Sequence, residues 1–280
     1  MNRTIATIKN AMWVGWEMET NWTKTWVYFL YAAVRPLSLC MILFFIFKIV
    51  TPDPAASQDF ISVFTGNAFF TIFIAVAGGI SWVVIQDREH YRIIRYIFVA
   101  PMPFWLYILG RAAVILLVSL ASLILILVFG AAVLAFPIGP EHIAFGLLLP
   151  ATFFGVISAA ALGLLFAGIC LVTARHSMLM AEGAGAVFLL VCGVLYPLDM
   201  LPKWAQTMGI GLPMTYWMEL VRRSFGGYGF SPRLAGMTDP TLLALLAALT
   251  AGFCVLAMGV FKLCEHAAKR SGKIDQTTNY

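Results

Sequence analysis

Residues 105–136 read WLYILGRAAVILLVSLASLILILVFGAAVLAF, and Arg111 is their one charged residue. An α-helix rises about 1.5 Å per residue, so roughly 20 apolar residues cross the ~30 Å hydrocarbon core of a bilayer. This stretch is long enough to cross with residues to spare. Further stretches qualify or nearly qualify at 27–50, 61–85, 143–173, 179–197 and 241–263. The sequence therefore predicts an all-α membrane protein with six transmembrane helices.

The composition of the whole chain fits a membrane environment. Of its 280 residues, 61% are hydrophobic and 11% are charged, whereas about 25% of residues are charged in a typical soluble domain. This composition excludes a water-soluble enzyme, a disordered chain and a secreted disulfide scaffold. The net charge of +5 requires no nucleic acid, because cytoplasmic loops carry an excess of Lys and Arg. The five cysteines lie in apolar stretches without metal-site spacing, so we expect core thiols.

The distribution of Lys and Arg predicts the orientation of these helices. With the N-terminus inside, twelve Lys and Arg residues fall on the cytoplasmic side and four on the external side, as the positive-inside rule requires. The external four are Lys203, Arg222, Arg223 and Arg233. Both termini are therefore predicted to be cytoplasmic, with a transmembrane domain over 27–264 and a cytoplasmic tail over 265–280.

The segment before the first span, residues 1–26, predicts an amphipathic helix that lies in the membrane interface. Its apolar side chains recur at steps of three and four, at Ile5, Ile8, Met12 and Trp16, which is typical of such helices. Two interpretations remain open. The helix is either an anchor on the membrane surface or a surface that also contacts a cytoplasmic partner.

A charged segment, residues 86–101, separates the second span from the third, and we expect a short cytoplasmic helix that ends at Pro101. Its stripes recur at helical spacing: Arg88, Arg92 and Arg95 on the basic one, Tyr91, Ile94 and Phe98 on the apolar one. Anchoring by positive charge explains the arginines, but neither the acidic Asp87 and Glu89 nor the apolar stripe. A helix that docks into a partner's groove explains both.

Residues 197–226 precede the last span and predict a re-entrant hairpin on the external side. A seventh crossing over 196–221 is disfavoured, because it would contain Pro197, Pro202 and Pro213 and would export the basic tail. Two short half-helices that dip in from outside, broken near Gly209–Gly211 and Pro213, fit better, since non-helical backbone at that depth must be buried in protein or line water. The hairpin is thus a candidate exit for a transported molecule.

Charges inside the spans are candidates for function, because burying one in a bilayer costs about 2.5–3.5 kcal/mol on insertion scales. Arg35 and Lys48 lie in the first span, where each can snorkel to its own side. Otherwise Arg35 faces a cavity, in which it could pair with Glu182 or hold an anionic head group.

The fourth span carries small residues at every fourth position: Gly155, Ala159, Gly163 and Ala167. Small residues let another helix approach closely. We interpret this face as a packing surface without chemistry.

Catalytic motifs are absent from the sequence. It contains no G-x-x-x-x-G-K-[ST] phosphate loop, and its four histidines are scattered without an H-E-x-x-H motif. We therefore expect that the chain is not an enzyme and binds no cofactor itself. Glu182 stands alone within the spans, which weighs against an ion-coupled carrier.

Two segments, together with the predicted topology, resemble the permease subunit of type-2 ABC exporters. The first, similar to that family's coupling segment, runs from Asp87-Arg88-Glu89-His90 to Ala100-Pro101-Met102-Pro103. The second, similar to the family's signature before its last span, is Tyr196-Pro197-Leu198-Asp199-Met200-Leu201-Pro202-Lys203-Trp204, continued by Leu212-Pro213-Met214-Thr215-Tyr216 and Glu219-Leu220-Val221-Arg222.

The resemblance implies an integral protein of a bacterial plasma membrane. It further implies a homodimer, or a pair with a similar permease, on two copies of a separate ATPase subunit that holds ATP and Mg. The implied coupling residues are Asp87, Arg88, Glu89, Tyr91, Arg92, Ile94, Arg95 and Phe98. The implied pathway residues are Arg35, Glu182, Tyr196, Trp204, Tyr216, Trp217 and Arg222.

The substrate stays open between two classes. The Arg35-Pro36 pair and the segment 87–103 favour an exported drug or lipid, whereas aromatic residues near the membrane boundaries suggest a lipid-linked polysaccharide or glycolipid. Rivals of another class are a membrane scaffold that transports nothing and a channel or ion-coupled carrier.

Overall fold

A computed structural model describes residues 3–20, 25–50, 58–133, 143–173, 177–226 and 229–272. Within these ranges every regular element is helical, as the sequence predicts. The elements in chain order are α1 (Arg3–Thr20), α2 (Thr25–Val50), α3 (Gln58–Ile85), the π-helical turn η2 (Gln86–His90), α4 (Ile94–Val99), α5 (Phe104–Val133), α6 (Phe145–Val172), α7 (Ser177–Val191), the 3₁₀ turn η4 (Leu198–Met200), α8 (Lys203–Ile210), α9 (Pro213–Gly226), α10 (Pro232–Ala235) and α11 (Asp239–Ser271).

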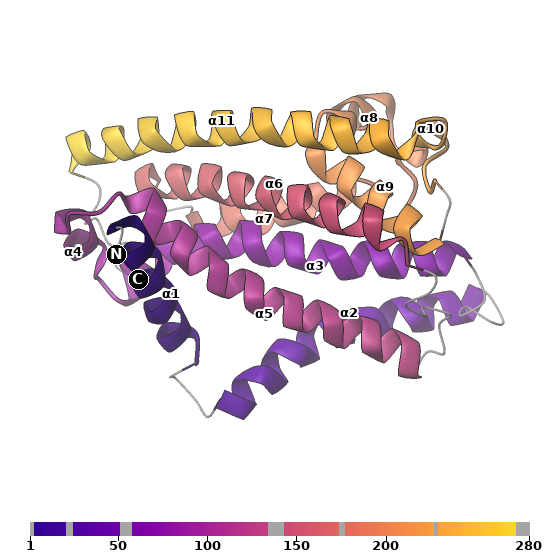
Figure 1. Ribbon diagram of the computed structural model, residues 1–280, viewed down its shortest axis with the longest axis horizontal. Helices are drawn as coiled ribbons and strands as arrows, with labels where there is room; N and C mark the ends of the chain where they lie inside the picture. Colours follow the sequence, from indigo (N-terminus) through magenta and orange to yellow (C-terminus); the bar gives the residue numbers. More distant parts are fainter. Residues whose placement is uncertain are drawn as a thin grey trace.

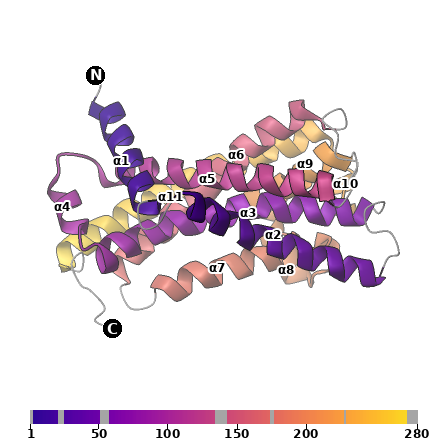
Figure 2. The same cartoon turned by 90° about the horizontal axis from the view of Figure 1, so that it is seen from below.

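The long helices run side by side in one elongated bundle (Figure 1). Helix α6 packs against α11 and α3, and α5 packs against α3. The shorter α9 packs against α3, α6 and α11. Helices α1 and α4 lie at one end of the bundle, called the α4 end below, and α8 and α10 lie at the other, called the α10 end (Figures 1 and 2).

Within the described residues, four helices are long and apolar enough to cross a membrane. They are Asp59–His90, Phe104–Ala132, Phe145–Val172 and Asp239–Ser271. These helices are candidate spans, and they coincide with the spans predicted over 61–85, 105–136, 143–173 and 241–263; residues 134–136 lie outside the described part of the chain. A shorter apolar stretch, Leu37–Ile49, lies within α2 and coincides with the predicted first span. Crossing by six helices stays a prediction.

The span predicted over 179–197 is too long at its C-terminal side. Helix α7 ends at Val191 after 15 residues, although the following residues are apolar. Gly193 adopts a positive φ of 64°, and the carbonyls of Gly193 and Val194 accept hydrogen bonds from Arg222 on α9. The positive φ of Gly193 breaks the helical ladder, and the hydrogen bonds from Arg222 hold the turn that follows.

The small-residue face of α6 forms close helix contacts, as predicted. A Cβ atom on Gly155 would lie 2.0 Å from the Trp217 ring of α9, and one on Gly163 would lie 2.8 Å from Ile80 of α3. Ala159 and Ala167, between and beyond them, are fully buried. The face serves two neighbouring helices at once, which places α6 at the centre of the bundle.

The N-terminal helix α1 packs on α5 through small residues instead of its apolar stripe. Ala11 is buried beneath Gly110, and Gly15 lies on the Arg111 side chain. Ile5 and Trp16 of the predicted stripe are 58% and 38% exposed. Ile8 and Met12 of the stripe are half-buried. Its exposed members, Ile5 and Trp16, are available for an interface with lipid or with a partner, and both interpretations stay open.

The predicted pair of half-helices corresponds to α8 and α9. The break falls at Gly211 and Leu212, close to the predicted position. Helix α9 is buried on nearly all sides, whereas α8 exposes Trp204 and Met208. Whether the pair dips into a membrane remains a prediction.

Candidate functional site

The α4 end contains a buried ion pair between α3 and α5. The π-turn η2 extends α3, and its Asp87 is fully buried. Arg111 of α5, 2% exposed, donates from Nη1 to Asp87 Oδ1 at 3.2 Å and to the Tyr107 hydroxyl at 3.1 Å. It also lies 2.9 Å from the Met18 sulfur of α1. The pair therefore joins α1, α3 and α5 at one point.

The next residue, Arg88, joins η2 to α6. It is 1% exposed and donates from Nη1 to the Cys170 carbonyl at 2.7 Å. This carbonyl belongs to the last turn of α6, where carbonyls lack intrahelical partners and carry partial negative charge. Arg88 also pairs with Glu89 at 3.0 Å. Two adjacent charged residues thus attach the end of α3 to both α5 and α6.

The exposed part of the predicted coupling segment is called the α4 surface below. Its exposed members are His90, Tyr91, Arg92, Arg95, Tyr96 and Val99. Among them Tyr96 is 63% and Val99 84% exposed. The α4 surface therefore presents two arginines and two tyrosines beyond the end of the bundle.

The single helix predicted over 86–101 does not form. It is interrupted between His90 and Ile94, where Arg92 takes a left-handed φ of 55°. Asp87 and Arg88 point into the bundle, and Ile94 is 1% exposed and belongs to the core. Phe98 packs against the Phe104 ring at 4.5 Å. Each predicted stripe is therefore divided between buried and exposed residues, because some of its charged and apolar members bind partners within the chain.

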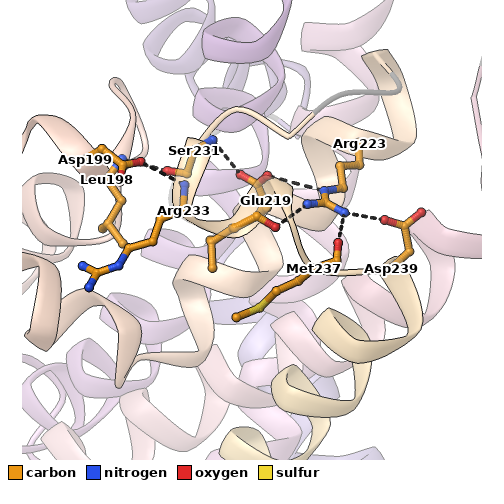
Figure 3. A network of polar contacts seen from close by, with 9 residues as sticks. Leu198, Asp199, Glu219, Arg223, Ser231, Arg233, Met237 and Asp239 are labelled. Atoms are coloured by element: carbon orange, nitrogen blue, oxygen red, sulfur yellow. Dashed lines mark hydrogen bonds and ion pairs between the residues drawn. The ribbon is translucent and has the colours of Figure 1, made fainter.

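The α10 end holds a second polar network, drawn in Figure 3. Glu219 of α9, 1% exposed, accepts from Arg223 Nε at 3.4 Å and from the Ser231 backbone N–H at 3.4 Å. Arg223 also donates to Asp239 at 2.8 Å and to the Met237 carbonyl at 2.8 Å. This network joins α9 to the loop before α10 and to the start of α11.

Arg222, the neighbour of Arg223, is committed to backbone carbonyls. It is 3% exposed and donates to Ser62 of α3 at 3.1 Å and to the carbonyls of Gly193 and Val194. Its guanidinium also lies 4.2 Å from the Phe230 ring centroid. A buried guanidinium with these partners has little capacity left for a substrate, so Arg222 holds the end of α7 against α3.

The electrostatics of these α9 residues follow from burial. Burial raises the pKa of Glu219, against the charges of Arg222 and Arg223 and the Ser231 N–H, which lower it. Burial lowers the pKa of Arg222 to about 10, against the charge of Glu219. Arg222 therefore stays cationic at neutral pH.

The remaining predicted pathway residues are not brought together. Tyr216 and Trp217 are buried in the bundle, 3% and 0% exposed. Trp204 on α8 is 63% exposed, and the Tyr196 hydroxyl donates to the Leu190 carbonyl at 2.7 Å. The backbones of Arg35 and Glu182 lie in α2 and α7, but their side chains lie outside the described part of the structure.

Arg111 and Glu219 are structural residues that sequence reasoning overlooked. Arg111 counts by sequence as one of the cytoplasmic charges, yet it is buried between helices. Its position in the first turns of an apolar span was the available signal.

Among the described residues, no group of three His, Cys, Asp or Glu side chains could hold a metal ion.

The helical bundle, with its long apolar helices, defines a multi-pass integral membrane protein. A profile of the family described as ABC-2 type transporter matches residues 11–225. This match covers most of the chain, and the protein therefore belongs to the ABC-2 type transporters as a membrane permease component. In this family the ATPase lies on a separate subunit. No match was found among curated proteins.

Proposed function

We propose that this chain is the transmembrane subunit of an ATP-driven exporter that moves an amphipathic, drug- or lipid-like substrate out across a bacterial plasma membrane. A separate ATPase subunit would dock at the α4 end. The observation that carries this proposal is the exposed α4 surface, which rests on a base of buried charged residues. Membership of the ABC-2 type transporters favours transport over a scaffold or an ion-coupled carrier.

The α4 surface has the properties of a docking site. Arg92, Arg95 and Tyr96 are exposed, and Arg and Tyr are enriched at the core of protein interfaces. A groove of about 580 Å³ lies near this surface, between α1 and the turn at 100–103, and is lined by residues that include Thr7, Asn10, Met102 and Tyr107. The ATPase would bind on the α4 surface and extend into this groove.

The buried charges beneath the surface supply a route for force. Asp87 is bonded to Arg111 of α5, and Arg88 is bonded to the end of α6. A push on residues 90–99 would therefore move α3, α5 and α6 as one body, since none can shift without breaking a buried bond. Rigid-body movement of packed helices is a common form of switching.

The complete permease would contain two copies of this chain, or this chain and a similar one, on two ATPase subunits. Each copy would cross the membrane six times, by α2, α3, α5, α6, α7 and α11, with both termini and the α4 end in the cytoplasm. ATP and Mg would bind only to the ATPase subunits. Substrate would leave between the two copies near α8 and α9.

An apolar hollow supports the choice of substrate class. It lies between α3, α6 and α7, and its lining includes Phe73, Phe166 and Phe188 beside Ala77 and Gly185. Ser81 is its one side chain with a polar group. A polysaccharide requires many hydrogen-bonding partners, whereas a drug or an acyl chain requires apolar surface. At about 20 Å³ the hollow has room for no more than about one water molecule, so α3, α6 and α7 would have to separate before a substrate entered. The apolar character of its lining is what supports a drug or lipid.

An exporter of a lipid-linked polysaccharide or glycolipid remains the second candidate. Trp204, 63% exposed on α8 at the α10 end, is the observation in its favour, because an aromatic face can stack on a sugar ring. The exposed tryptophan lies where the proposed exit would be.

The test is ATP hydrolysis by the permease–ATPase complex in lipid vesicles. Candidate lipids, amphipathic drugs and glycolipids are added one class at a time. The proposal predicts that a drug or lipid raises the hydrolysis rate. Replacing Gly78 by Phe should remove this stimulation while basal hydrolysis persists, because Gly78 lines the hollow and a Cβ added there meets no atom within 4 Å. Stimulation by glycolipids alone would support the second candidate, and hydrolysis unaffected by any class would contradict both.

A further inference from the structure

Helix α11 is longer than a membrane crossing requires, and its excess lies at the α4 end. It has 33 residues, or roughly 50 Å at 1.5 Å per residue, against a hydrocarbon core of about 30 Å. Its first residue, Asp239, is held by Arg223 at the α10 end at 2.8 Å. Counting about 20 residues from Asp239 reaches Gly259, so Lys262 follows directly after the second membrane boundary.

One exposed face of α11 changes from apolar to basic side chains near Lys262. Val255, Leu256 and Leu263 are 76%, 53% and 73% exposed. Lys262, His266 and Arg270 continue the same exposed face at steps of four residues. The side of the helix that would meet acyl chains therefore continues into a line of basic side chains, called the α11 basic stripe below.

The neighbouring charges on α11 are directed elsewhere. Lys269 pairs with Glu265 at 2.6 Å and lies over the Phe98 ring at 5.1 Å, so it faces α4. Glu265 is thereby neutralised and 18% exposed. Within the described residues no hydrogen bond or ion pair satisfies the charged ends of Lys262 and Arg270. Glu265, three residues after Lys262, is the acidic neighbour of the α11 basic stripe, and its ion pair with Lys269 offsets its charge.

The direction of the helix aims the stripe at the membrane. Every Cα–Cβ bond of an α-helix tilts toward its N-terminus, which for α11 is the α10 end on the far side of the bilayer. The side chains of the stripe therefore lean back toward the lipid. Lys262 lies at the boundary, beside the exposed apolar Leu263, where a lysine can bury its stem and keep its ammonium among head groups.

We infer that the α11 basic stripe binds the head groups of anionic phospholipids in the leaflet at the α4 end. The inference rests on the proposed function only for the crossing and orientation of α11. Each Lys or Arg near an anionic surface strengthens binding roughly five-fold. Lys262 and Arg270 together therefore predict a preference on the order of 20-fold for an anionic over a zwitterionic lipid.

The experiment counts the lipids retained by the purified full-length permease without any ATPase. Native mass spectrometry follows exchange into mixed phosphatidylglycerol and phosphatidylcholine. The wild type is expected to retain phosphatidylglycerol preferentially, and the triple variant Lys262→Gln, His266→Gln, Arg270→Gln to lose that preference. The adjacent residues supply a matched pair: Arg270→Gln should weaken the preference several-fold, whereas Lys269→Gln should not. Salt should weaken it in the wild type by screening.

Equal retention by the wild type and the triple variant would overturn the inference and leave the stripe a solvated face. Loss of preference in Lys269→Gln as well as Arg270→Gln would also overturn it, because the effect would then follow overall charge. Since lipids are counted on the permease alone, failure here leaves the exporter proposal standing.

Discussion

Removal of one member of the buried Asp87–Arg111 pair gives the sharpest prediction on stability. Arg111→Met deletes the guanidinium that reaches Asp87, Tyr107 and the Gln86 side chain. The Asp87 carboxylate is fully buried, so it would be left as an uncompensated charge. The double variant Asp87→Leu, Arg111→Met removes both charges and keeps apolar volume in their place.

The size of the effect follows from this burial. Breaking a buried pair by removing one partner costs about 3–5 kcal/mol, whereas replacing both by apolar residues is often nearly neutral. For a chain of this size, 1 kcal/mol shifts the melting temperature by roughly 2–4 °C. Arg111→Met should therefore lower the melting temperature by on the order of 10 °C. The double variant should recover most of the loss.

The assay is thermal unfolding of the purified permease, followed by loss of the monodisperse peak in size-exclusion chromatography. Lys203→Met, at an exposed lysine of the α10 end, is the control and should change the melting temperature little. If Arg111→Met melts with the wild type, or if the double variant is less stable than the single one, the ion pair does not hold α3 to α5 as argued.

Two further changes test the packing around α9. Gly155→Ala places a Cβ 2.0 Å from the Trp217 ring. Such overpacking should destabilise the permease by about 1–3 kcal/mol in the same unfolding assay. The control is Gly146→Ala on the same helix, where the added Cβ has no atom within 4 Å and should not destabilise the permease. Arg222→Leu removes the donor of the buried Gly193 and Val194 carbonyls, at about 1–3 kcal/mol each, and should melt well below Arg233→Leu, which alters an exposed side chain. An Arg222→Leu permease as stable as Arg233→Leu would show that those carbonyls find water instead.

The long helices could be predicted from the sequence because the signal is local. The length and hydropathy of 105–136 and 143–173 decide a transmembrane helix without reference to the rest of the chain. The break between α8 and α9 could also be predicted from the sequence, since Gly211 and Pro213 stop helices locally. The small-residue face of α6 could be predicted as well, because it follows from a local spacing of four residues.

The destination of the charged side chains could not be predicted, because it depends on distant partners. Arg88 bonds to a carbonyl 82 residues away, and no periodicity within 86–101 reveals this. The turn after α7 is held by Arg222 of a later helix, through the Gly193 carbonyl. Sequence patterns therefore could not separate exposed charges from buried ones within the polar segments.

In the proposed exporter, the exposed α4 surface is the contact with the ATPase subunit. The most direct measurement is the amount of ATPase that co-purifies with the Arg92→Glu, Arg95→Glu permease, compared with Lys203→Glu at the opposite end. Reversed charge across an interface costs several kcal/mol, so the double reversal should reduce the bound ATPase by at least about ten-fold. The Lys203→Glu permease should bind as the wild type does. Undiminished binding and ATP hydrolysis in the double reversal, with a folded permease, would contradict the account.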